Sequence, residues 1–227
     1  MIELNIVSIY RWEVQNMLVV AVIPAYNEGK TIGNVIKVVK EVDCIKDIIV
    51  VSDGSTDNTV EISKKMGAKV IELKKNLGKG GALKAGIEEA DGEVILFLDA
   101  DLVGLKKEHI IKLVKPVLDK EADMTVGIFN KGRIVTDIAQ KIAPFLSGQR
   151  AVSKKVLDDI SNLEVARYGV EIALTKYVEN SNLIVKQIVL EDLTHIMKEE
   201  KLGLIKGFTA RMKMYFDIIK YMLKSST

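Results

Sequence analysis

Apolar residues are spaced in two alternating ways along the chain, and this alternation predicts an α/β fold. Apolar runs within residues 18–23, 47–52, 69–73 and 94–98 are typical of strands, and the unbroken run 94–98 fits a strand covered on both faces. Helical spacing occupies the stretches between them, at 31–42, 60–67 and 78–90. Strands separated by helices predict right-handed βαβ crossovers and a mostly parallel sheet flanked by helices.

The second half continues this alternation less regularly. The pattern predicts strands at 123–129 and 183–190, a turn at 147–150, and helices at 109–118, 134–145, 153–160, 168–178 and 204–223. We expect residues 18–227 to form a single domain, with 18–104 and 105–227 as its two halves. Residues 1–17 form an N-terminal leader or an edge strand.

Composition narrows the class of protein. The chain has 227 residues, 48% hydrophobic and 28% charged, which is typical of a folded globular protein. Its 33 basic and 31 acidic residues leave a net charge of +2, which argues against a nucleic-acid partner. The single cysteine, Cys44, has no disulfide partner in the chain, and no segment resembles a signal peptide or a membrane span. These features predict a cytoplasmic protein, with Cys44 in a helix and His109 at the surface.

Two aspartates follow the strand at 94–98, and they are the first candidates for chemistry. In an extended segment Asp99 and Asp101 point to the same side, so both carboxylates can reach one divalent cation. The alternative is that they cap the helix that follows or form a polar turn. The residues alone leave both interpretations open.

Polar segments also follow the first two strands. Residues 24–28 come after the first strand and residues 53–55 after the second. In open α/β sheets, ligands bind at the carboxyl ends of the strands. Three polar segments at one sheet edge therefore favour a binding site.

The segments 23–28, 51–57, 76–82 and 99–101 together resemble family 2 glycosyltransferases of the GT-A fold. The likeness covers residues 18–104 and implies a Rossmann-like nucleotide-diphospho-sugar transferase domain. It implies that the nucleoside lies against Pro24, Ala25, Tyr26 and Glu28. By the same likeness Glu28 would accept hydrogen bonds from the ribose, and Asp53 would contact the base, most naturally uracil.

The resemblance also implies how the diphosphate is bound. Lys79 would lie near the base or the pyrophosphate. Asp99, Ala100 and Asp101 would hold a Mg²⁺ or Mn²⁺ ion that bridges the two phosphates.

Segments 132–137, 145–151 and 168–172 resemble glucosyl-3-phosphoglycerate synthases. That likeness implies that Tyr168 and Glu171 contact the donor sugar and that His195 completes the metal site. Two departures argue against 3-phosphoglycerate as the acceptor. Where the synthases have an arginine, this chain has Leu193. Where they have an acidic residue, it has a glutamine and an arginine at positions 149–150. The loop cations Lys131, Arg133 and Arg150 still offer contacts for an anionic acceptor.

The resulting prediction is a metal-dependent transferase that moves a hexose, with UDP-glucose as the favoured donor, to a small, anionic hydroxyl acceptor. Asp101, through the metal, and Glu171 are the catalytic candidates. An inverting reaction needs a base, for which Glu171, Glu191 or Asp192 is available, whereas a retaining reaction needs none.

Three alternatives remain. Apolar residues of 204–223 recur at helical spacing among basic ones, which allows a membrane-surface helix and a polyprenyl-phosphate acceptor, or a homodimer contact. A sugar-nucleotide pyrophosphorylase would share the sheet, but no glycine-rich segment with an arginine follows the first strand. A non-catalytic nucleotide-sugar-binding protein is the third alternative.

Overall fold

A seven-stranded sheet organises the part of the chain that the computed structural model describes, which comprises residues 18–129, 147–159, 174, 177 and 181–195. The strands lie in the order β3 (Lys69–Glu72), β2 (Ile45–Ser52), β1 (Val19–Ala25), β4 (Val94–Phe97), β7 (Arg150–Ser153), β6 (Met124–Phe129) and β8 (Val185–Leu190). Strand β7 runs antiparallel to β4 and β6, and the other pairs are parallel. The predicted mostly parallel α/β sheet is therefore confirmed.

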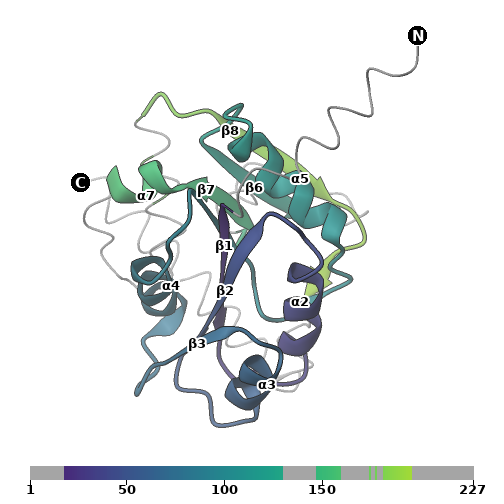
Figure 1. Cartoon of the computed structure of the whole chain (residues 1–227), viewed down its shortest axis with the longest axis vertical. Coiled ribbons are helices and arrows are strands. Elements are labelled where there is room, and N and C mark those ends of the chain that lie inside the picture. Colours follow the sequence, from purple (N-terminus) through teal and green to yellow (C-terminus); the bar gives the residue numbers. More distant parts are fainter. Residues whose placement is uncertain (1–17, 130–146, 160–173, 175–176, 178–180, 196–227) are drawn as a thin grey trace, which may run out of the picture. The chain divides into compact units, whose positions relative to one another are not determined.

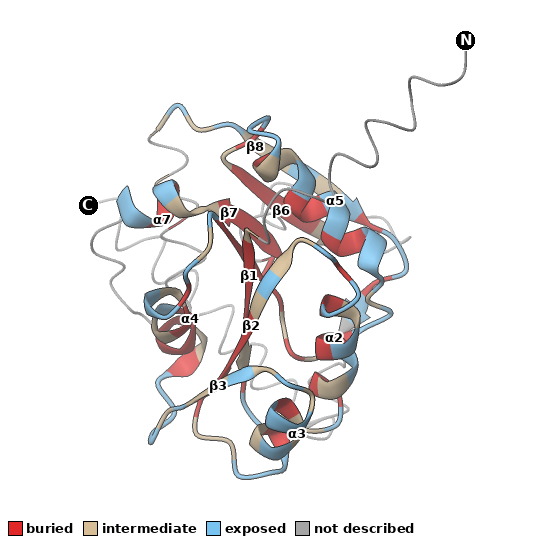
Figure 2. Cartoon of the chain, in the orientation of Figure 1, coloured by how far each residue is buried: buried red, intermediate tan, exposed pale blue. Residues whose placement is uncertain are grey.

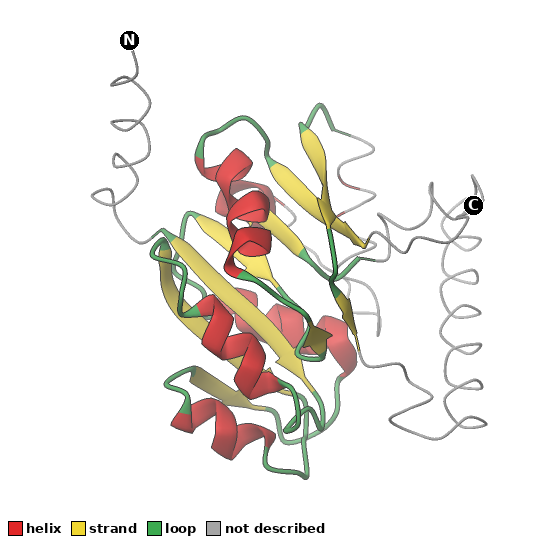
Figure 3. Ribbon diagram, turned by 90° about the vertical axis from the view of Figure 1, so that its right-hand side faces the viewer, coloured by secondary structure: helices red, strands yellow, loops and turns green. Residues whose placement is uncertain are grey.

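Helices cover both faces of this sheet (Figures 1 and 3). Helices α2 (Ile32–Val39), α3 (Thr59–Lys65) and α5 (Lys107–Leu118) pack on one face, and α4 (Gly78–Glu88) and α7 (Lys154–Asp159) on the other. Alternate residues of β1 supply the two cores, with Ala21 and Ile23 facing α2 and α5, and Val20 and Val22 facing α4. Figure 2 shows the buried strands between these layers.

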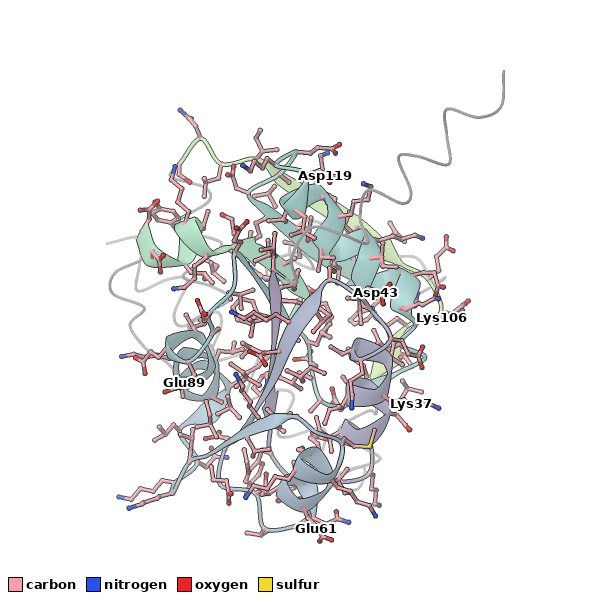
Figure 4. The ribbon with its side chains drawn as sticks, in the orientation of Figure 1. Lys37, Asp43, Glu61, Glu89, Lys106 and Asp119 are labelled. Carbon is pink, nitrogen blue, oxygen red and sulfur yellow. The ribbon has the colours of Figure 1, made fainter. Side chains whose placement is uncertain are left out.

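Charged side chains lie on the outside of these layers. The residues labelled in Figure 4 are all exposed: Lys37, Asp43, Glu61, Glu89, Lys106 and Asp119. None of the helices among the described residues is long and apolar enough to cross a membrane.

The chain divides by its internal contacts into a unit of residues 1–193 and a unit of residues 194–227. The sheet and its helices belong to the first unit, which also contains the two-residue strand β5 (Leu102–Val103). The second unit contributes strand β9 (Thr194–His195). The division into a leader at 1–17 and a single domain at 18–227, with halves 18–104 and 105–227, stays a prediction.

The order of the strands places the polar segments together. From β1 the chain moves outward to β2 and β3 and then returns to β4 on the other side of β1. This change of direction is the switch point at which open α/β sheets bind ligands. Residues 26–28 after β1 and 99–101 after β4 therefore leave the sheet at neighbouring positions of its carboxyl edge.

The predicted turn at 147–150 is wrong at its last residue, because Arg150 begins strand β7. Arg150 pairs with Phe97 of β4 and with Val126 of β6. The strand has only four residues and begins with a charged one, so its sequence carries almost no strand signal. Its antiparallel direction brings residues 147–149 to the edge where β4 ends.

Two side chains of the first unit also differ from expectation. Cys44 lies in the turn before β2, not in a helix, and burial raises its pKa to about 11. His109 is only 5% exposed rather than at the surface, and its Nδ1 accepts the N–H of Lys106 at 3.2 Å at the start of α5. Burial is the main reason that the pKa of His109 is lowered.

Gly86 sets the distance between α4 and the sheet, which yields a prediction. A methyl group there would overlap Val22 of β1 and lie 3.1 Å from Val51 of β2. Overpacking costs about 1–3 kcal/mol, more than the roughly 1 kcal/mol that alanine gains over glycine in a helix. We expect Gly86→Ala to lower the free energy of unfolding by about 1 kcal/mol in urea titrations.

The matched control is Gly33→Ala in α2, where the new methyl group would meet, among the described residues, only the Ile62 side chain, at 3.2 Å. That variant should be as stable as the parent protein or more stable. Equal stability changes in the two variants would contradict the prediction, because they would show that the close packing of Gly86 against β1 and β2 has no effect of its own.

Candidate donor-binding site

Hydrogen bonds join the segment after β1 to the segment after β2. The N–H of Asn27 donates to Ser55 Oγ at 3.1 Å, and its Oδ1 accepts the N–H of Thr56 at 2.8 Å. Asn27 has a positive φ of 56°, a conformation that asparagine tolerates better than most residues. The two segments therefore form one unit, from which the Tyr26 side chain is 50% exposed.

Asp57 makes a second connection between these segments. Its Oδ2 accepts the N–H of Gly29 and its Oδ1 accepts the N–H of Thr59, both at 3.0 Å, and the Thr59 hydroxyl also donates to Oδ1. Burial raises the pKa of Asp57, but the hydrogen bonds from Thr59 and Gly29 outweigh it and lower the pKa. Asp57 lies one residue before Asn58, the N-cap of α3, and from there accepts the N–H of the first helical residue, a contact that was not predicted.

Glu28 lies half-buried between these contacts. Its N–H donates to Thr59 Oγ1 at 2.9 Å, and its carboxylate Oε2 lies 3.5 Å from the hydroxyl of Thr31, just before α2. The Pro24 and Ala25 positions belong to the end of β1, where Ala25 is buried.

Asp53 is almost fully buried, with 4% exposure, and it joins β1, β2 and α4. Its N–H donates to the Ala25 carbonyl at 2.8 Å, and its Oδ1 accepts the N–H of Leu77 at 2.7 Å, one residue before α4. The carboxylate thus holds the start of the helix that carries Lys79. The predicted contact of Asp53 with a base stays a prediction.

Asp99 and Lys79 form an ion pair at the carboxyl edge. Lys79 Nζ, from the first turn of α4, lies 2.6 Å from Asp99 Oδ1. Both side chains are partly exposed, at 27% for Lys79 and 18% for Asp99, so the pair stays accessible to solvent. Ala100 is buried and Asp101 partly exposed, and residues 100–101 form a turn instead of the expected extended segment.

The segment before β7 contacts this ion pair. Gln149 is fully buried, and its Nε2 donates to Asp99 Oδ2 at 2.7 Å. Sequence reasoning treated Gln149 only as a departure from an acidic residue and missed this contact, because it depends on the unpredicted strand β7.

Arg150 is not the exposed loop cation that the acceptor prediction requires. Its side chain is only 1% exposed, and its Nε donates to the Ser147 carbonyl at 2.9 Å. Lys131 and Arg133, the other two predicted acceptor contacts, lie outside the described residues.

Several predicted site residues cannot be located with the others. Tyr168 and Glu171 lie outside the described residues. His195 belongs to β9 in the second unit, and its side chain is outside what the structure describes. Glu191 and Asp192 are exposed after β8, and Asp192 Oδ2 lies 3.5 Å from Lys106 Nζ.

Comparison with known proteins decides which family this arrangement represents. The family model described as "Glycosyl transferase family 2" matches residues 20–166, which include β1 to β4 and the segments at the carboxyl edge. The chain belongs to glycosyl transferase family 2. The resemblance stated from the motifs is thereby confirmed, and the protein is a glycosyltransferase.

Two curated relatives differ in how much they share with this glycosyltransferase. The uncharacterized protein MJ1222 of Methanocaldococcus jannaschii is 30% identical over 235 residues, which cover 91% of this chain and 95% of the relative. Glycosyltransferase AglD of Haloferax volcanii is 34% identical over 118 residues, covering 47% of this chain but only 19% of AglD. The match to AglD thus concerns only part of each protein.

Among solved structures, glucosyl-3-phosphoglycerate synthase of Mycobacterium tuberculosis in complex with Mn²⁺, UDP-glucose and phosphoglyceric acid is similar. It is 28% identical, with a TM-score of 0.66, over 79% of this chain and 71% of the other. The same synthase has been solved with Mn²⁺, UDP and glucosyl-3-phosphoglycerate, at 27% identity and the same TM-score. The expected GT-A fold is therefore confirmed.

The donor set at the carboxyl edge of the glycosyltransferase fits a divalent cation that is shared with a diphosphate. Among the described residues no group of three or more His, Cys, Asp or Glu side chains converges. Magnesium sites in which substrate phosphates supply oxygens need only one or two protein carboxylates. Asp99 and Asp101 would supply that number, and the Asp99 side chain is 18% exposed.

Asp57 provides a prediction about the binding segments. Asp57→Ala removes the acceptor for two backbone N–H groups, and loss of such a cap costs about 1 kcal/mol. The pKa of Asp57 in the folded protein lies below its ordinary value of 3.8. The carboxylate therefore stabilises the fold fully above pH 3.8, and this stabilisation is lost as the pH falls through the pKa of the folded protein. Urea titrations should show the destabilisation at pH 7 and a smaller one near pH 3.

Glu61→Ala is the control, because Glu61 is an exposed acidic residue in the first turn of the same helix (Figure 4). Its loss should change stability by no more than about 0.5 kcal/mol. A destabilisation by Asp57→Ala that does not depend on pH would contradict the assigned role of the carboxylate.

Proposed function

We propose that this family 2 glycosyltransferase transfers glucose from UDP-glucose, in a metal-dependent reaction, to a small, anionic hydroxyl acceptor. The observation that carries the proposal is the Asp99–Lys79 ion pair at the carboxyl edge of β4, 2.6 Å in length, with Asp101 two residues along the chain. The similar synthase structures, which contain Mn²⁺ with UDP-glucose or UDP, support this choice of donor and metal.

The charges of the site suit a nucleoside diphosphate. Asp99 and Asp101 would hold a Mg²⁺ or Mn²⁺ ion, and the ion would offset the negative charge that develops on the departing UDP. The third ligand that the resemblance implies, His195, stays a prediction. Lys79 lies beside Asp99 and would exchange part of this ion pair for a contact with the diphosphate. In this arrangement Asp99 would bind the metal ion while the adjacent Lys79 binds a phosphate.

The remaining donor contacts follow the order of the segments along the sheet edge. Glu28 would accept hydrogen bonds from the ribose, Asp53 would face the base, and the exposed ring of Tyr26 would pack against the nucleoside. Tyr168 and Glu171 would contact the sugar. Because Asp53 Oδ1 already accepts the N–H of Leu77, we assign the base contact to its other oxygen, Oδ2.

The acceptor and the stereochemistry decide the role of Glu171. If the product has inverted configuration, Glu171 is the base that takes the acceptor proton; if configuration is retained, the departing phosphate takes it. A screen with radiolabelled UDP-glucose should include phosphorylated hydroxy acids and polyprenyl phosphates as the two acceptor classes. NMR of the product then identifies the anomer.

Metal-dependent donor binding is the direct test. We expect calorimetry to detect UDP-glucose binding with Mn²⁺, and Asp99→Asn or Asp101→Asn to weaken it at least about tenfold, because each removes a charged contact to the ion. Asp43→Asn is the control, since Asp43 is exposed at the amino end of β2, away from this edge (Figure 4). Full affinity in both site variants would refute the metal site, and tighter binding of GDP-mannose would refute the donor.

A further inference from the structure

Gln149 is a polar side chain that is fully buried beside the proposed donor site. It immediately precedes β7, whose first residue pairs with the last residue of β4. A buried amide without hydrogen-bond partners would destabilise the fold, and Gln149 satisfies its donor group on a carboxylate: Nε2 lies 2.7 Å from Asp99 Oδ2. Two residues that lie 50 positions apart in the chain are thereby joined.

The orientation of the amide is fixed by its neighbours. An ionised carboxylate only accepts hydrogen bonds, so the NH₂ group must face Asp99 and Oε1 must face the other way. There the Ser147 hydroxyl lies 3.2 Å from Oε1 and 2.5 Å from the Gly127 carbonyl of β6, and its one proton can be donated to either. Gln149 is held to β6 through its backbone, whose carbonyl accepts the N–H of Gly127 at 2.8 Å, and its side chain holds Asp99.

The backbone at Gly148 closes against the same groups. A side-chain carbon added there would lie 2.6 Å from each carboxylate oxygen of Asp99, and still closer to Lys79 Nζ. The backbone at Gly148 therefore lies close to the ion pair, and a larger residue there would require Lys79 and Asp99 to move. Asp99 is held at Oδ1 by Lys79 and at Oδ2 by Gln149, which fixes the plane of its carboxylate.

We propose that Gln149 is a positioning residue for donor binding, which holds the Asp99 carboxylate in the orientation that receives the metal–diphosphate complex. This inference rests on the proposed function. An amide suits the task because it donates a hydrogen bond without adding charge. Lysine or arginine in its place would neutralise Asp99, and a carboxylate would repel it. Without the amide, Asp99 can rotate so that both oxygens face Lys79, which opposes the exchange that a diphosphate requires.

The test compares UDP affinity with and without Mn²⁺ in Gln149→Met, which keeps the length of the side chain and removes its hydrogen bond. Hydrogen bonds to charged groups are worth roughly ten- to hundredfold in affinity. We expect UDP to bind about tenfold more weakly than to the parent protein when Mn²⁺ is present. UDP binding without metal, followed by ligand-observed NMR, should change less than about twofold.

Thr125→Val is the matched control, because the buried Thr125 hydroxyl donates to the Leu113 carbonyl at 2.7 Å on the face of α5. This variant should lose stability but keep the UDP affinity of the parent protein with Mn²⁺. Gln149→Asn, whose shorter amide cannot reach Asp99, should repeat the metal-dependent loss and replaces Gln149→Met if that variant does not fold.

The outcomes separate the two proposals. If the parent protein binds UDP with Mn²⁺ and the Gln149 variants bind it equally well, the positioning role is wrong and the proposed function stands. Equal losses with and without Mn²⁺ would also refute the positioning role, because they would indicate general damage to the site. If the parent protein binds no UDP under either condition, the proposed function fails and the role of Gln149 fails with it.

Discussion

The described site depends on how the negative charge of Asp99 is compensated at the end of the apolar strand β4. Strand β4 and Leu98 are buried, and the next residue, Asp99, has a side chain that is only 18% exposed. A carboxylate in that position requires opposite charge and hydrogen-bond donors, since loss of hydration is otherwise uncompensated. Lys79 supplies the charge from α4, and Gln149 supplies a neutral donor from the segment before β7.

The compensation of this charge requires α4, β4 and the segment before β7 to meet at one edge of the sheet. The start of α4 is held by Asp53 through the N–H of Leu77, and its last turn approaches β1 and β2 closely because Gly86 has no side chain. The antiparallel direction of β7 brings its first residue to the end of β4. Packing in the sheet thus determines the distance between Lys79 and Asp99, and with it the charge that a ligand would meet.

The sequence predicted the elements that have a strong local signal. The apolar runs of β1, β2 and β4 and the helical spacing of α2 and α5 were sufficient, because covered strands and amphipathic helices have distinct periods. The rule that ligands bind at carboxyl ends placed Asp99 at that edge, and the family resemblance added Lys79 near the base or the pyrophosphate. Asp99 and Asp101 as metal ligands remain proposals, since geometry alone does not identify the ion.

What the sequence could not provide were contacts that exist only after the sheet has formed. Strand β7 has four residues and a buried arginine at its start, so its periodicity is too short to recognise. Because the predicted turn covered Arg150 and the predicted helix covered Ser153, β7 was not recognised, and Gln149 had no visible partner 50 residues earlier in the chain. Asp57 differs, because its contact with Thr59 at the start of α3 is local, whereas its contact with Gly29 depends on the fold.

The same contact changes the meaning of the departure at residues 149–150. From sequence, an amide and an arginine in place of an acidic residue argued against a phosphoglycerate acceptor. In the structure, Gln149 touches Asp99, and Arg150 is buried against the Ser147 carbonyl. A carboxylate at position 149 would meet Asp99 at the distance where the amide now donates, and one of the two acids would have to bind a proton. The departure therefore concerns the charge of the donor site, and it carries no argument about the acceptor.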